Sequence, residues 1–133
     1  MTAAPPPTAA DAPFSVLLCD DNTLLLETLT EVVRAQPDLE VVGTARDDAQ
    51  ALLLARRLQP DLVVLDVRFP GGGHRVATSI AACSPGSRIV AFSAYDDKAS
   101  VEQMRSAGVH AYVLKGTSNR DLLDALRQAA GPR

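Results

Sequence analysis

The sequence has no long hydrophobic run, since no apolar stretch approaches the roughly 20 residues that a membrane-spanning helix requires. It also has no excess of basic residues: 13 Lys and Arg stand against 16 Asp and Glu, for a net charge of -3. A nucleic-acid-binding footprint is therefore not indicated. The two cysteines, Cys19 and Cys83, are too far apart for a common metal-binding spacing. We expect them to be small buried hydrophobes in a reducing compartment.

The first twelve residues, MTAAPPPTAADA, lack the basic start and the apolar segment of a secretion signal. Their Ala/Pro-rich composition predicts a flexible lead-in with some polyproline II character. A total of 133 residues, 47% hydrophobic and 22% charged, suits one globular domain. We expect that domain at residues 13–130 and a short tail at 131–133, in a cytoplasmic protein.

Short apolar runs alternate with segments of helical periodicity along the rest of the chain. The near-continuous Val and Leu of these runs is typical of a parallel sheet covered by helices on both faces. The second predicted helix is expected to turn Leu52, Leu53 and Leu58 inward. The fold class is therefore α/β, a doubly wound (βα)5 sandwich. The predicted strands are 14–19, 39–45, 61–66, 88–93 and 111–115, and the predicted helices are 23–36, 47–59, about 75–83, 96–107 and 119–129.

Polar residues stand where four of the predicted strands end. Ligands of doubly wound sheets bind beyond the carboxyl ends of the strands, so these side chains should share one site. Clustered carboxylates suit Mg²⁺ or Mn²⁺, and a lysine opposite them suits a phosphoryl group. Each residue alone would more often be a helix cap or a solvated side chain, and it is their combination that indicates a site. The residues are Asp20 and Asp21 after the first strand, Asp66 after the third, Ser93 after the fourth and Lys115 after the fifth.

Four segments together resemble the receiver domain of bacterial two-component response regulators: VLLCDDN, LVVLDVRFPG, IVAFSAYDD and AYVLKG. The parts DVRFPG and YVLKG are most similar to the NarL/FixJ-type subgroup. The resemblance implies a flavodoxin-like (CheY-like) fold with strand order 2-1-3-4-5. It also implies a phosphoacceptor domain in signal transduction rather than an enzyme.

The resemblance implies a role for each residue at the strand ends. Asp66 would accept a phosphoryl group from a phosphohistidine of a sensor histidine kinase. Asp21, Asp66 and the backbone carbonyl of Arg68 would bind Mg²⁺, and Asp20 would act through a metal-bound water. Lys115 would pair with the phosphoryl oxygens.

The resemblance also implies residues that transmit and time the signal. Ser93 would hydrogen-bond the phosphoryl group, and Tyr112 matches the family's aromatic switch position. Arg68 and Tyr95 stand two residues after Asp66 and Ser93, where the family controls the access of water. Because both are large and neither can orient a water as a carboxylate or amide does, we expect slow self-dephosphorylation.

The loop PGGGH, residues 70–74, departs from the family pattern, which has an apolar residue after the first Pro-Gly. Because glycine costs helix stability, we expect a loosened start of the third helix.

Two other functions compete with a switching receiver. A degenerate receiver that serves only as a docking module would not need the intact set of five polar residues. A phosphatase with an aspartate nucleophile would carry a second aspartate at the position of Arg68.

The partners can be predicted only in part. A NarL/FixJ-type protein usually continues into a helix-turn-helix domain, whereas this sequence has only GPR after residue 130, where the predicted domain ends. It is either a stand-alone receiver with an unknown downstream protein or a piece that lacks its output domain. We expect no direct nucleic-acid contact and no membrane contact, and a phosphorylation-dependent homodimer is compatible with the resemblance.

Overall fold

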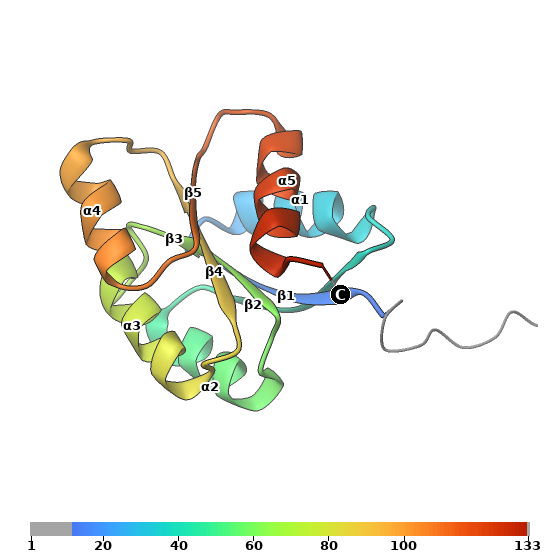
Figure 1. The fold of residues 1–133 in the computed structure, drawn as a ribbon, viewed down its shortest axis with the longest axis horizontal. Coiled ribbons are helices and arrows are strands. Elements are labelled where there is room, and N and C mark those ends of the chain that lie inside the picture. Colours follow the sequence, from blue (N-terminus) through green and yellow to red (C-terminus); the bar gives the residue numbers. More distant parts are fainter. Residues whose placement is uncertain (1–11, 133) are drawn as a thin grey trace, which may run out of the picture.

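The computed structural model describes residues 12–132. The predicted lead-in at residues 1–12 lies outside them except for Ala12, so its flexibility and its boundary stay predictions. The described chain alternates regularly between strands and helices (Figure 1). The strands are β1 (Phe14–Cys19), β2 (Leu39–Ala45), β3 (Leu62–Asp66), β4 (Arg88–Ser93) and β5 (Ala111–Leu114), and the helices are α1 (Thr23–Arg34), α2 (Asp48–Leu58), α3 (Gly73–Cys83), α4 (Lys98–Ser106) and α5 (Asn119–Ala130).

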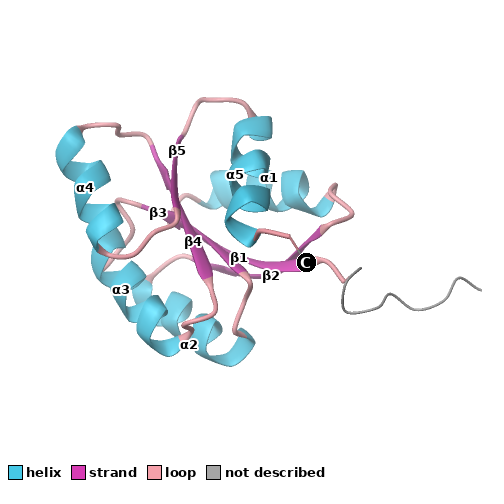
Figure 2. Ribbon diagram, in the orientation of Figure 1, coloured by secondary structure: helices cyan, strands magenta, loops and turns pink. Residues whose placement is uncertain are grey.

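The five strands form one parallel sheet in the order β2-β1-β3-β4-β5, which confirms the expected doubly wound sandwich. Helices α1 and α5 cover one face of the sheet, and α2, α3 and α4 cover the other (Figure 2). Because all strands run in the same direction, their carboxyl ends meet at one edge of the sheet. Within residues 12–132, no helix is long and apolar enough to cross a membrane.

Successive strand residues pack on opposite faces of the sheet. In β1, Leu17 and Cys19 pack toward α2, α3 and α4, whereas Val16 and Leu18 pack toward α1 and α5. With both faces buried, the strand has no solvent side, which explains its continuous apolar sequence. Cys19 is buried as expected, and burial raises the pKa of its thiol, whereas Cys83 is half-buried.

The packing of α2 differs from the expectation. Ala51 and Ala55 are fully buried against the sheet, and Leu52 is half-buried beside them. Leu53 is 44% exposed, so the prediction that it faces inward was wrong. Leu58 is 41% exposed, but its Cδ1 lies against Gly43 of β2. The prediction placed leucines on the inner face of α2 because they are the larger apolar residues, whereas two small alanines are the residues that are fully buried there.

The start of α3 also differs from the expectation. The helix begins at Gly73, about two residues earlier than predicted, after Gly72 adopts a φ of +89°. Two backbone hydrogen bonds close the turn: Gly72 N–H donates to Phe69 (2.9 Å) and Gly73 N–H donates to Val67 (3.2 Å). A Cβ at Gly73 would lie 2.5 Å from the carbonyl oxygen of Val67. The glycines therefore permit a tight turn directly after Asp66, while α3 has no side-chain N-cap hydrogen bond and its expected loosening stays a prediction.

Gly73→Ala should lower the free energy of unfolding by about 1–3 kcal/mol, because the added methyl group meets backbone that cannot move aside easily. Urea denaturation measures the change. Gly86→Ala is the matched control, since a Cβ there would meet nothing within 4 Å. We expect it to stay within about 0.5 kcal/mol of wild type. Equal stability of the two variants would contradict the requirement for close packing at Gly73.

Candidate functional site

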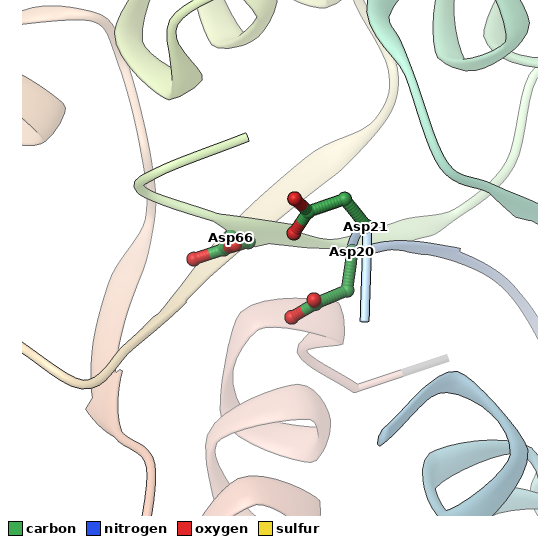
Figure 3. A group of neighbouring side chains, drawn as sticks. All are labelled: Asp20, Asp21 and Asp66. Carbon is green, nitrogen blue, oxygen red and sulfur yellow. The ribbon is translucent and has the colours of Figure 1, made fainter. Parts of the chain in front are cut away.

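The carboxyl edge of the sheet brings three aspartates together. Because Cys19 pairs with Leu65 in neighbouring strands, Asp20 and Asp66 come next to each other where β1 and β3 end. Both are almost fully buried, while Asp21 is exposed. Figure 3 shows Asp20 and Asp21 extending from one chain segment and Asp66 from the other. Each offers a carboxylate oxygen, and these three oxygens lie within 4.8 Å of one another.

The turn after β1 fixes the orientation of Asp20. The backbone N–H of Asn22 donates to Asp20 Oδ1 at 2.9 Å, and the Asn22 side chain accepts from the N–H of Leu25 at 3.1 Å. The second bond is the N-cap of α1, so one residue both starts the helix and orients the carboxylate. Asn22 was missed by the sequence reasoning, although an Asn directly before a helical segment is an N-cap signal.

Lys115 supplies positive charge from the other side of the site. Its Nζ lies 2.7 Å from Asp20 Oδ2 and 3.5 Å from Asp66 Oδ1. Its backbone N–H donates to the Ser93 carbonyl at 2.7 Å, which anchors the lysine beside the end of β4. Within this group of four side chains, three carboxylates face one ammonium, which leaves two negative charges when all are ionised.

The remaining negative charge raises the energy of ionised Asp66. Burial raises the pKa of this carboxyl group above its usual range, and the charge of Asp20 adds to that rise. The Lys115 ammonium and the Arg68 N–H, which donates to Asp66 Oδ1 at 3.2 Å, act in the opposite direction. Burial and repulsion outweigh them, so the pKa is raised on balance and a further cation would stabilise ionised Asp66.

The group fits a divalent cation. Carboxylate oxygens are the ligands that Mg²⁺ prefers, and a charge of +2 would match the two negative charges left over. Exposed Asp21 leaves room for the waters that Mg²⁺ keeps. The Arg68 peptide adjoins the site through its N–H, while the ligand role of its carbonyl stays a prediction.

Ser93 and Tyr112, the predicted signalling residues, both form hydrogen bonds with the backbone of Tyr95. Ser93 is fully buried, and its Oγ accepts from the Tyr95 N–H at 3.0 Å. The Tyr112 hydroxyl donates to the Tyr95 carbonyl. The Arg68 guanidinium lies 4.1 Å from the centre of the Tyr95 ring. Arg68 and Tyr95 therefore stack on each other instead of extending separately into solvent.

This stack was not foreseen. The strand order places the ends of β3 and β4 side by side, so residues two positions beyond each end are close enough to meet. Asp97 was also missed as the N-cap of α4, where its carboxylate accepts from the Ser100 N–H at 3.0 Å. As a result α4 begins at Lys98, two residues later than predicted.

Comparison with known proteins identifies the class. Residues 16–127 match the family of response regulator receiver domains, and the chain belongs to this family. It is 36% identical to the nitrate/nitrite response regulator NarL of Escherichia coli (strain K12) over 119 residues, 89% of this chain and 55% of that protein. It is 37% identical to the transcriptional regulatory protein PdtaR of Mycobacterium tuberculosis (strain H37Rv) over 126 residues, 93% of this chain and 61% of that protein.

A solved receiver-domain structure is also similar to this chain. The signal receiver domain of a response regulator named NarL from Mycobacterium tuberculosis matches with a TM-score of 0.86 and 30% identity, covering 92% of this chain and 99% of that one. The receiver fold and the likeness to NarL-type regulators are thereby confirmed. The chain spans between about half and three-fifths of the length of the curated relatives named here.

Asp66→Asn should raise the free energy of unfolding at pH 7 in a metal chelator, because it removes a carboxylate charge that burial and the charge of Asp20 destabilise. A raised native pKa means that wild type has its full stability below the unfolded value of about 3.8 and loses part of it as pH rises through the native pKa. The gain of the variant should therefore vanish in acid. Thermal unfolding across pH measures it, with exposed Asp21→Asn as the control. A less stable Asp66→Asn at neutral pH would contradict the charge argument.

Proposed function

We propose that this receiver accepts a phosphoryl group on Asp66 from the phosphohistidine of a sensor histidine kinase, in a reaction that depends on Mg²⁺ or Mn²⁺. The observation that carries the proposal is the environment of Asp66. It is a buried carboxylate with an ammonium 3.5 Å away and two further carboxylates at metal-binding distance. Membership of the receiver family makes phosphorylation the expected chemistry.

The transfer forms one bond and breaks one. A carboxylate oxygen of Asp66 attacks phosphorus, and the bond from phosphorus to the imidazole nitrogen breaks with its electron pair left on the ring. Lys115 stands close enough to Asp66 to neutralise an incoming phosphoryl oxygen. A bound divalent cation would supply further charge neutralisation. Asp21, Asp66 and the Arg68 carbonyl would hold that cation, with Asp20 acting through a water.

The signal would leave the site through Ser93 and Tyr112. The Ser93 hydroxyl can turn from its contact with Tyr95 to donate to a phosphoryl oxygen. Tyr112 is tied to the same residue through its hydroxyl, so a movement of Tyr95 changes the contacts of Tyr112. Both roles would alter the surface around β5 and α4.

Other parts of the function follow from the family. The protein would work in the cytoplasm, as a phosphoacceptor in signal transduction that keeps the transferred group rather than releasing a product at each turnover. Its downstream partner would be a separate protein or an output domain outside this sequence. A homodimer formed on phosphorylation is a further candidate for the active state.

Mg²⁺ and acetyl phosphate should add one phosphoryl group to the wild-type chain, because the small donor needs only the site itself. Intact-mass measurement detects the adduct. Asp66→Asn should gain none, and Asp21→Ala should lose metal dependence or reactivity. Ser93→Ala should still gain the group, since its proposed role follows the transfer. An adduct on Asp66→Asn equal to that of wild type would disprove the acceptor assignment.

Arg68 and Tyr95 should slow the loss of the phosphoryl group, because both side chains are large enough to cover the path of an attacking water and the guanidinium can pair with the phosphoryl oxygens. Arg68→Asn and Tyr95→Glu should speed decay on the order of tenfold, which corresponds to about 1.4 kcal/mol in the barrier. Decay of the phosphorylated mass over time measures this, with exposed Arg75→Asn as the matched control. Decay that is unchanged or slower in both variants would refute shielding.

A further inference from the structure

Arg68 connects the loop after β3 with the loop after β4. Its backbone N–H donates to Asp66 Oδ1, and its guanidinium lies over the Tyr95 ring. Its charge also reaches Asp97, whose pKa lies below its usual range mainly because Ser100 donates hydrogen bonds to it, with Arg68 as a smaller cause. One side chain therefore begins at the proposed phosphoacceptor and ends against the segment that precedes α4.

That segment, residues 94–97, has few other ties to the sheet edge. Tyr95 is fixed through its backbone to Ser93 and Tyr112, but the residue is 45% exposed and its ring has the guanidinium as a stacking partner. Asp97 caps the first turn of α4. Because Tyr95 is two residues before this N-cap, a contact that fixes the Tyr95 ring also restrains the start of α4.

We propose that Arg68 is a coupling residue, which holds segment 94–97 through the Tyr95 ring and releases it when a phosphoryl group on Asp66 draws the guanidinium away. The inference rests on the proposed phosphorylation of Asp66 and goes beyond it by naming a second connection from that site to α4. In the route through Ser93, a new hydrogen bond to the phosphoryl group would move segment 94–97, whereas in the route through Arg68 the segment would lose an existing contact.

The relative strength of the two contacts gives the direction of the change. A guanidinium binds a phosphoryl group through two charge-assisted hydrogen bonds in a planar geometry that suits both partners. Its attraction to an aromatic ring is weaker where the ring is solvated, as at Tyr95. The backbone N–H of Arg68 already lies 3.2 Å from Asp66 Oδ1, so the new charge would form next to the residue that carries the guanidinium. The stack is therefore the contact that breaks.

The test compares amide chemical shifts of residues 95–100 in the full chain, before and after treatment with acetyl phosphate and Mg²⁺. Samples are compared at equal phosphoryl content, determined by intact mass. In unphosphorylated Arg68→Ala, these shifts should move toward the positions of the phosphorylated wild type. The further change on phosphorylation should be less than half that of wild type. Arg75→Ala is the control, since Arg75 is an exposed arginine of α3 and should behave as wild type.

Arg68→Lys separates stacking from charge and keeps the test valid if Arg68→Ala fails to fold. It retains the positive charge without the planar group, so its shifts should fall between those of wild type and Arg68→Ala. Equal phosphorylation-induced shifts in wild type and the Arg68 variants would overturn the coupling and leave the phosphoacceptor role intact. A wild-type chain that gains no phosphoryl group would overturn the proposed function and this inference with it.

Discussion

Repulsion between carboxylates at the carboxyl edge of the sheet is the constraint on which the site depends. Parallel strands end at the same edge, so the fold itself forces Asp20 and Asp66 together, and burial denies them the screening of water. Lys115 is held against both and offsets part of the repulsion. The balance stays negative, so this edge of the sheet fits a divalent cation.

The backbone next to Asp66 is also tightly constrained. The turn after Asp66 brings the start of α3 so close to the Val67 carbonyl that only glycine fits at position 73. The same turn directs the Arg68 N–H to the Asp66 carboxylate. The glycine-rich loop thus fixes the peptide groups next to Asp66, the proposed phosphoacceptor, where small displacements would matter most.

The fold and the membership of the site followed from the sequence because both are set by coarse patterns. Continuous apolar runs required a sheet buried on two sides, and the strand ends collected the polar residues. Features that depend on the rotation of a helix about its axis or on the direction of a side chain could not be predicted from the sequence. The inner face of α2 belongs to Ala51 and Ala55 because their small size allows close packing, while leucine content pointed elsewhere. The Arg68–Tyr95 stack required the distance between two loops, which no local pattern encodes.

A phosphoryl group would add negative charge where the balance is already negative, so its arrival must redistribute the nearby cations. Lys115 lies closer to Asp20 than to Asp66, by 2.7 Å against 3.5 Å, and has a short distance to move. Arg68 would have to leave a present contact, because its guanidinium lies over a ring in the neighbouring loop. A cation that must leave a structural contact in order to neutralise a new charge changes the structure at that contact, and so transmits phosphorylation to it. A cation that is already at the site only stabilises the phosphoryl group. By this argument Lys115 would serve the proposed phosphotransfer, and Arg68 would transmit it to α4.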